Sequence, residues 1–154
     1  MTETEPIDGD APPSNRIWAS QWYRMTPRSF AHNELFFDPE RVLFVFAGES
    51  YKSFLLRRDG REDHARELGE TYRTRSADSI LADERHEGVP ASSLETIRLR
   101  SGSWIRKPKL EIVGNGFERT LYHGSRRQDV ESLAGKLADQ YPSVTVVCNG
   151  EKIA

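Results

Sequence analysis

The most constraining feature of the sequence is an Asn-Gly pair between two strand-like segments, residues 109–113 and 117–122. Asn115 and Gly116 both tolerate positive φ, which the tight two-residue turns of β-hairpins require. Upstream of this pair, Ile97 and Leu99 alternate with arginines at 98 and 100, so the aliphatic and basic side chains fall on opposite faces of an extended chain. The second half of the chain is therefore predicted to be antiparallel sheet with one apolar and one basic face.

The first half of the chain is rich in aromatic residues but shows little regular alternation of apolar and polar residues. Ten of the fifteen aromatic residues lie between residues 18 and 54, which indicates that the core starts there. The segments 41–47 and 53–57 are predicted as the strands of a first hairpin, joined by the Gly-bearing connection 48–52. Residues 18–35 have no clean period, so both strand and helix stay open for them.

Two helical regions are expected. The densely charged segment 59–87 carries apolar residues at spacings that suit one or two short helices on the surface of the domain. A longer helix is predicted over residues 125–141, because Ser125 and Gln128 form a capping-box pattern and a proline follows at 142. Its apolar face would consist of Val130, Leu133, Ala134, Leu137 and Tyr141. Residues 144–147 would add a short strand.

Composition limits the class of protein. Residues 1–15 hold four acids and three prolines and are predicted to be a disordered tail, which leaves one domain over residues 16–148 and a frayed C-terminal tail at 149–154. The single cysteine, Cys148, excludes an internal disulfide, and no CxxC or His/Cys cluster suggests a zinc module. No signal-like or membrane-spanning stretch is present, so a soluble cytoplasmic protein is expected.

The order of these segments resembles that of pleckstrin-homology-like (PH-like) domains of bacteria and archaea. In that family a Pro-small-small-aliphatic stretch, a basic turn, an aliphatic strand, a hairpin, an aromatic-bearing strand and a closing helix follow one another. Here the corresponding segments are 89–94, the strand 95–100 into which that stretch leads, 101–108, 109–113, 117–123 and 125–141, and the resemblance covers residues 38–141. The charged insert at 59–87 departs from a compact member of the family.

The resemblance implies an α+β fold that is mainly β: a partly open antiparallel barrel, or two packed sheets, closed by a C-terminal amphipathic helix. It also implies a binding scaffold, in which loops at the open end of the barrel contact the ligand. Inositol lipids are not expected as ligands, because the first hairpin offers Lys52, Arg57 and Arg58 but carries Glu49 and lacks the Arg-x-Arg pair of lipid-binding members.

A basic region in the second half provides the candidate site. The chain has a net charge of −2, yet residues 95–136 hold nine basic against five acidic residues. The loop 101–108 adds an aromatic and an aliphatic residue at its centre, and such a loop suits an acidic partner surface, anionic lipids or a nucleic-acid backbone. The alternative is that the tryptophan folds back and the cations solvate the outer sheet face. The candidate partner-binding or anion-binding residues are Arg98, Arg100, Trp104, Arg106, Lys107, Lys109, Arg126 and Arg127.

Arg126 and Arg127 would lie in the first turn of the predicted helix, where the helix dipole disfavours cations. Together with Lys107, Lys109 and His123 they suggest an anion site at the helix N-terminus. Neutralisation by Glu118 or by acids of the insert is the alternative.

The sequence contains no nucleophile elbow, HExxH motif or Cys–His spacing, so neither an enzyme nor a cofactor is expected. Two functions remain. The first is a PH-like interaction module whose protein partner pairs with a strand edge or covers an apolar groove. The second is electrostatic binding of an anionic membrane surface or nucleic acid through residues 98–127. The first is favoured because the overall charge of −2 repels a polyanion at long range.

Overall fold

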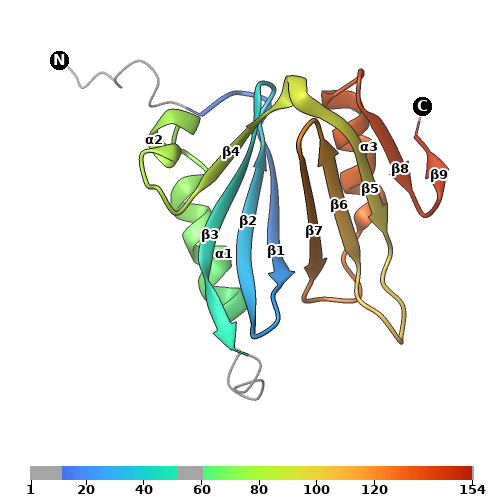
Figure 1. Ribbon diagram of the computed structural model, residues 1–154, viewed down its shortest axis with the longest axis horizontal. Coiled ribbons are helices and arrows are strands. Elements are labelled where there is room, and N and C mark those ends of the chain that lie inside the picture. Colours follow the sequence, from blue (N-terminus) through green and yellow to red (C-terminus); the bar gives the residue numbers. More distant parts are fainter. Residues whose placement is uncertain (1–11, 52–60, 154) are drawn as a thin grey trace.

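Nine strands form one open sheet in a computed structural model that describes residues 12–51 and 61–153 (Figure 1). The strand order is β4-β3-β2-β1-β7-β6-β5-β8-β9, and neighbouring strands are antiparallel except for the parallel pair of β5 and β8. The fold is therefore α+β and mainly β, as predicted. The strands are β1 (Ile17–Met25), β2 (Ser29–Phe37), β3 (Arg41–Tyr51), β4 (Glu87–Pro90), β5 (Leu94–Arg100), β6 (Lys109–Gly114), β7 (Phe117–His123), β8 (Thr145–Cys148) and β9 (Glu151–Lys152).

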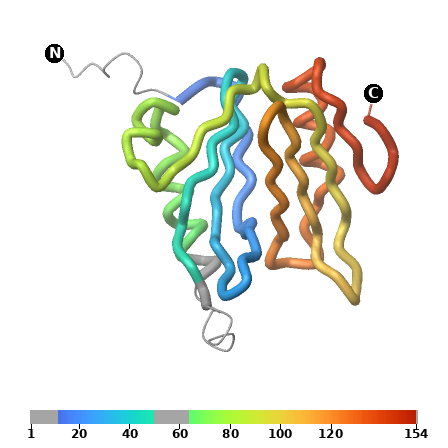
Figure 2. The backbone as a smooth tube through the Cα atoms, in the orientation of Figure 1, coloured from blue at the N-terminus to red at the C-terminus, as the bar shows by residue number. Residues whose placement is uncertain are grey.

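Two three-stranded meanders make up most of the sheet and lie side by side (Figure 2). In the second meander, β6 and β7 pair with Gly114 opposite Phe117, which leaves Asn115 and Gly116 as the turn. Gly116 has a φ of +87°, the left-handed conformation that a hairpin turn of this kind needs. The predicted second hairpin is thus confirmed, as is the alternation of buried Ile97 and Leu99 along β5.

The first meander differs from the prediction. β3 continues to Tyr51 through most of the predicted connection 48–52 and pairs with β2, so the predicted hairpin of 41–47 with 53–57 is wrong. Residues 53–57 lie outside the described residues. The undecided segment 18–35 forms β1 and most of β2. The segment shows no alternation of apolar and polar residues, because β2 is buried on both faces. Apolar residues therefore follow one another at its end, as at Leu35, Phe36 and Phe37.

Helices cover the sheet at both halves (Figure 1). The helices α1 (Arg61–Tyr72) and α2 (Ala77–Leu81) form within the charged segment and contact the β1–β4 half. Phe36, Leu43 and Val45 of the sheet form a small core with Ile80 of α2. Alternate residues of β2 and β3, such as Leu35 and Phe44, belong instead to the main core, which the helix α3 (Val130–Gln140) shares with β5–β8.

The apolar face of α3 is buried as predicted, but the helix begins at Val130 and not at Ser125. Asp129 is the N-cap, and its carboxylate Oδ1 accepts a hydrogen bond from the Ser132 N–H at 3.0 Å. Ser125 instead accepts from the Arg127 N–H at 3.2 Å, within the loop that precedes the helix. The capping-box prediction is therefore wrong in position.

The predicted short strand at 144–147 is confirmed as β8, and residues 149–152 form a turn and the strand β9 where a frayed tail was expected. β8 pairs with β5 at one side and with β9 at the other, and the Ile153 N–H donates to the Val146 carbonyl at 2.8 Å. Asn149 adopts a φ of +52° in the turn between β8 and β9. At the other end of the chain, residues 1–11 of the predicted tail lie outside the described residues. No helix of the described part has the length and apolarity that crossing a membrane requires.

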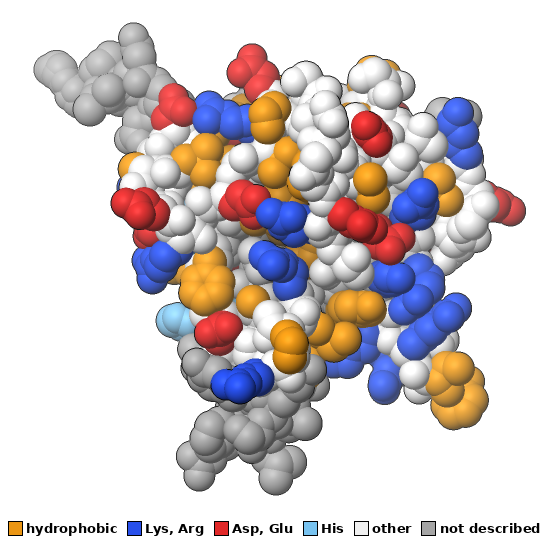
Figure 3. All heavy atoms as spheres, viewed as in Figure 1, with side chains coloured by type: hydrophobic (Ala, Val, Ile, Leu, Met, Phe, Trp, Pro, Cys, Tyr) orange, Lys and Arg blue, Asp and Glu red, His pale blue; other side chains and the backbone are white. Residues whose placement is uncertain are grey.

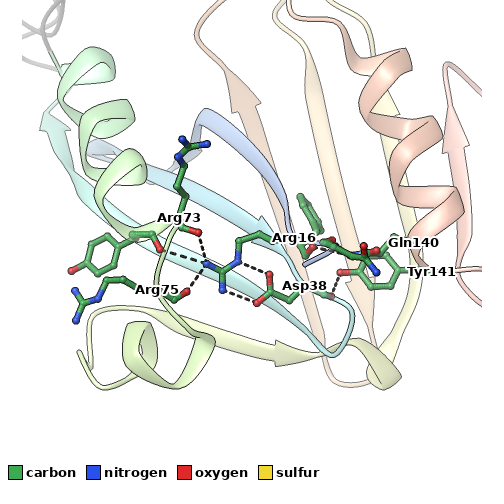
Figure 4. A network of polar contacts seen from close by, with 9 residues as sticks. Arg16, Asp38, Arg73, Arg75, Gln140 and Tyr141 are labelled. Carbon is green, nitrogen blue, oxygen red and sulfur yellow. Dashed lines mark hydrogen bonds and ion pairs between the residues drawn. The ribbon is translucent and has the colours of Figure 1, made fainter. Parts of the chain in front are cut away.

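A network of polar contacts joins four parts of the chain (Figure 4). Arg16 binds both carboxylate oxygens of Asp38, at 2.7 and 2.9 Å, and also donates to the carbonyls of Arg73 and Arg75 after α1. The Tyr141 hydroxyl donates to the Asp38 carbonyl at 2.5 Å. The network thus fixes the β2–β3 turn against the end of α1 and the end of α3.

Candidate functional site

Four of the predicted cations surround one groove on the outer face of β5 and β6. Arg98, Arg100, Arg106 and Lys109 line this groove, whose volume is about 380 Å³ and which reaches the β8–β9 turn. The strand register explains the grouping, since Arg100 lies opposite Lys109 and Arg98 lies opposite Glu111. We call this feature, defined by its four cations, the basic groove.

The charge in the basic groove is only partly neutralised. Glu111 is its acidic residue, with a carboxylate 3.8 Å from Arg98 Nη1 and 3.5 Å from Lys109 Nζ. Arg100 Nη2 donates to the Lys107 carbonyl at 3.1 Å. Among the described residues, no carboxylate lies within ion-pair distance of Arg100 or Arg106. The groove therefore keeps an excess of positive charge for an anionic ligand.

The loop 101–108 between β5 and β6 has a defined backbone. The Ser103 N–H donates to the Arg106 carbonyl at 2.8 Å, and Ser101 exchanges two hydrogen bonds with the Asn149 side chain. At the loop's centre, 86% of Trp104 and 65% of Ile105 are exposed to solvent. The alternative expectation, in which Trp104 folds back onto the sheet, is therefore wrong.

The remaining predicted cations, Lys107, Arg126 and Arg127, do not line the groove. The Lys107 ammonium is 5.5 Å from the centre of the Tyr23 ring on β1. Arg126 and Arg127 are exposed in the loop between β7 and α3. The backbone of that loop contacts loop 101–108 so closely that a Cβ at Gly102 would meet the Arg126 carbonyl oxygen at 2.5 Å.

The predicted anion site at the helix N-terminus is not formed. Arg126 and Arg127 precede α3, so they do not oppose its dipole, and the Asp129 carboxylate occupies the helix terminus. His123 is buried, with Nδ1 accepting from the Ser125 N–H at 2.9 Å and Nε2 3.0 Å from the Ser20 carbonyl. This pairing requires the neutral tautomer with the proton on Nε2, and burial lowers the His123 pKa in agreement. His123 therefore has a structural role.

Another arginine of the basic region forms an ion pair within the molecule. Arg119 Nη2 on β7 contacts Glu87 Oε2 on β4 at 2.5 Å. Arg119 shares its side of β7 with buried Leu121, so it faces inward and away from the basic groove. The excess of basic residues counted over residues 95–136 is thus larger than the excess on the outer face of β5 and β6.

A second polar feature lies where β1 is irregular. The pairing of β1 with β2 shifts between Ala19 and Trp22, and Gln21 adopts a φ of +70°. The bulge lines a cavity of about 360 Å³, to which α1 contributes Arg66 and α3 contributes Lys136. The sequence does not predict this cavity. A β-bulge can be recognised in a sequence only where it interrupts a regular alternation of apolar and polar residues, and β1 has no such alternation.

Glu34 lies beneath α1 and is fully buried. Its carboxylate accepts hydrogen bonds from Trp18 Nε1 at 2.7 Å and from the Gln21 N–H at 2.8 Å. Burial nevertheless dominates and raises the pKa of Glu34 to about 7. A Cβ at Gly69 would collide with this carboxylate, so glycine at that position lets α1 close over it.

The described residues include no group of three or more His, Cys, Asp or Glu side chains placed to hold a metal ion. Comparison of the chain with models of known protein families gives no match, and comparison with curated protein sequences gives none either.

Proposed function

We propose that the chain is a non-catalytic PH-like interaction module that binds an acidic segment of a partner protein in the basic groove. The strand order supports the PH-like part of this proposal. β1 to β4 and β5 to β7 each follow one another along the chain, β1 lies beside β7, and the amphipathic α3 comes next. If the strands β1 to β7 curved into a barrel in this order, the barrel would stay open between β4 and β5. The insertion of α1 and α2, and the addition of β8 and β9, are departures from a minimal domain.

One observation carries the binding proposal: four cations from β5, β6 and their connecting loop surround a single groove with one acidic residue. An extended acidic segment would find charge complementarity there, and the base of the groove is formed by the antiparallel pair of β5 and β6. The partner surface expected from the sequence was a strand edge or an apolar groove. The basic groove is a more specific candidate, because it selects a partner by charge.

The environments of the buried titratable groups support a non-catalytic role. His123 is bound to two backbone groups, and His86 Nδ1 accepts the Phe46 N–H at 3.0 Å. Glu34 is enclosed by α1 and accepts from Trp18 and Gln21. Packing within the fold accounts for each of these groups.

The proposal is tested with a labelled polyglutamate peptide as the probe and fluorescence anisotropy at low salt as the measurement. The double variant Arg98→Glu/Arg106→Glu is expected to weaken binding by about tenfold or more, because it reverses two charges in the groove. Glu111→Gln is expected to strengthen binding, since Glu111 competes with the ligand for Arg98 and Lys109.

Lys152→Glu is the matched control, because Lys152 is an exposed cation on β9 that does not line the groove. It should change the affinity far less than the groove variant does. Equal effects of the two changes would contradict a specific groove, as would tighter binding of a DNA duplex than of the peptide at the same salt concentration.

A further inference from the structure

Large apolar side chains are exposed at one end of the molecule. Among the described residues, the exposed large apolar side chains are those of Met25, Trp104 and Ile105, and 52%, 86% and 65% of their surface is accessible to solvent. Met25 ends β1 at the β1–β2 turn, whereas Trp104 and Ile105 belong to loop 101–108. Figure 1 shows both segments, and the loop between β7 and α3, at the lower end of the sheet. We call this surface the loop end.

Side-chain and backbone contacts join the three segments of the loop end. Lys107 of loop 101–108 lies over the Tyr23 ring of β1, at 5.5 Å from its centre. Gly102 of the same loop packs against the Arg126 carbonyl of the β7–α3 loop. The loop end is therefore one surface with a fixed arrangement, although its parts are distant in sequence.

Cations surround the exposed apolar residues. In Figure 3, Lys and Arg side chains gather beside the apolar tip at the lower right. Among the described residues, the acids of the same region are Asp129, which caps α3, and Glu49, which accepts a hydrogen bond from the Ser29 hydroxyl at 2.9 Å. The exposed or half-exposed cations of the three segments are Arg24, Arg28, Arg106, Lys107, Arg126 and Arg127.

We propose that the loop end docks on the surface of an anionic lipid bilayer. Trp104, Ile105 and Met25 would enter the interfacial layer, where tryptophan in particular is favoured, while the surrounding cations contact lipid phosphates. Peripheral binding of this kind needs two signals, apolar insertion and a basic patch, and the loop end presents both. The loop end shares only Arg106 with the basic groove, and the proposal goes beyond the proposed binding of a partner protein.

Shape favours a bilayer over a protein as the occupant. A protein pocket would take Trp104 as a single anchor, but Met25 protrudes from a different turn. A planar surface can receive tips from separate loops at the same time. The excess of cations over acids among the described residues of the loop end also matches the negative potential of a membrane surface.

The experiment uses the full chain with vesicles of phosphatidylcholine, with and without phosphatidylglycerol. Co-sedimentation measures binding, and tryptophan emission reports insertion. Trp22 is fully buried and Trp18 is partly covered, so a blue shift on vesicle addition reports Trp104. We expect binding and a blue shift with phosphatidylglycerol vesicles, and loss of both as salt is raised.

Two variants separate the apolar and the charged contributions. Trp104→Ser/Ile105→Ser should abolish the blue shift and most of the binding. Arg126→Gln/Arg127→Gln should lower the partition coefficient by about tenfold or more, because each cation near the surface contributes to attraction. The control Lys152→Gln removes one exposed cation from β9 and should have an effect of less than about twofold. Circular dichroism confirms that each variant is folded.

Three results would overturn the proposal. The first is no association with phosphatidylglycerol vesicles at low salt. The second is association without a tryptophan shift, or with undiminished binding of Trp104→Ser/Ile105→Ser, since either excludes insertion. The third is stronger association with a protein or DNA probe through the same residues, which would assign the loop end to a different macromolecule.

Discussion

Arg16 and Asp38 form an ion pair in which the side chains are only 5% and 3% exposed. The guanidinium contacts both carboxylate oxygens and also donates to carbonyls beyond the end of α1, where a cation complements the helix dipole. Because both charges are buried, each depends on the other for compensation.

Removing one member of this pair should destabilise the protein strongly. Arg16→Ala leaves the Asp38 carboxylate buried without its partner, and we expect a loss of about 3–5 kcal/mol in the free energy of unfolding. Urea denaturation measures this loss. Arg41→Ala is the control, since its 2.9 Å ion pair with Asp78 is exposed and should contribute about 1 kcal/mol or less. Similar losses in both variants would contradict the role assigned to Arg16.

The packing of α3 can be tested at Leu137, which is fully buried in the main core. Leu137→Ala removes apolar contacts and leaves a cavity, so a loss of about 2–5 kcal/mol is expected. Its neighbour Lys136 is exposed, and Lys136→Ala should stay within about 0.5 kcal/mol of the unchanged protein. A small loss at Leu137 would mean that α3 does not close the core.

Glu34 predicts a pH dependence with a defined sign. Its pKa rises from 4.5 to about 7 in the folded protein, so the folded state holds the proton more tightly than the unfolded state does. The contribution of protonated Glu34 to the free energy of unfolding is therefore complete below pH 4.5 and is lost as the pH rises through 7. Glu34→Gln cannot titrate, so its stability relative to the unchanged protein should rise by about 3 kcal/mol over this range. A difference that does not change with pH would exclude the shift.

His123 predicts the opposite sign. Its folded pKa lies below the ordinary value of 6.5, so the unfolded state binds the proton more readily. Stability is full above pH 6.5 and falls as pH drops below it, because a second ring proton would face the Ser125 N–H. His86 contributes with the same sign, since burial lowers its pKa too. NMR titration of the His123 ring should give a pKa below 6.5, and His123→Gln should reduce the acid-induced loss of stability; a higher pKa would refute this assignment.

The strands of the second meander could be predicted from the sequence because one face of this part of the sheet is exposed to solvent. Solvent on the outer face leaves Arg98 and Arg100 alternating with Ile97 and Leu99, and that alternation is visible in the sequence. The first meander lacks such a signal, since α1 and α2 bury the second face of β2 and β3. Which of the two faces a residue of β2 occupies is decided by tertiary contacts.

The start of α3 was missed for a similar reason. Ser125 and Gln128 fit a capping box, but the Ser125 N–H is bound to His123, a contact that local sequence does not reveal. The cations of the basic groove were found because they occupy one face of paired strands. Met25 was not singled out, because a lone methionine at the end of a strand has no recognisable pattern.

The junction between β1 and β7 has a consequence for how the protein folds and opens. Within the described residues, these strands pair only at Trp22 with His123 and Tyr23 with Tyr122, whereas pairing inside each meander extends along the strands. Each meander consists of local hairpins that can form early, while the junction closes a loop of about a hundred residues, at an added entropic cost. Backbone pairing is thus sparse across the middle of the sheet, and side chains hold the two meanders together there: the shared main core, the Arg119–Glu87 ion pair and the hydrogen bond from Tyr141 to the Asp38 carbonyl. The sheet can open at this junction only when these contacts break.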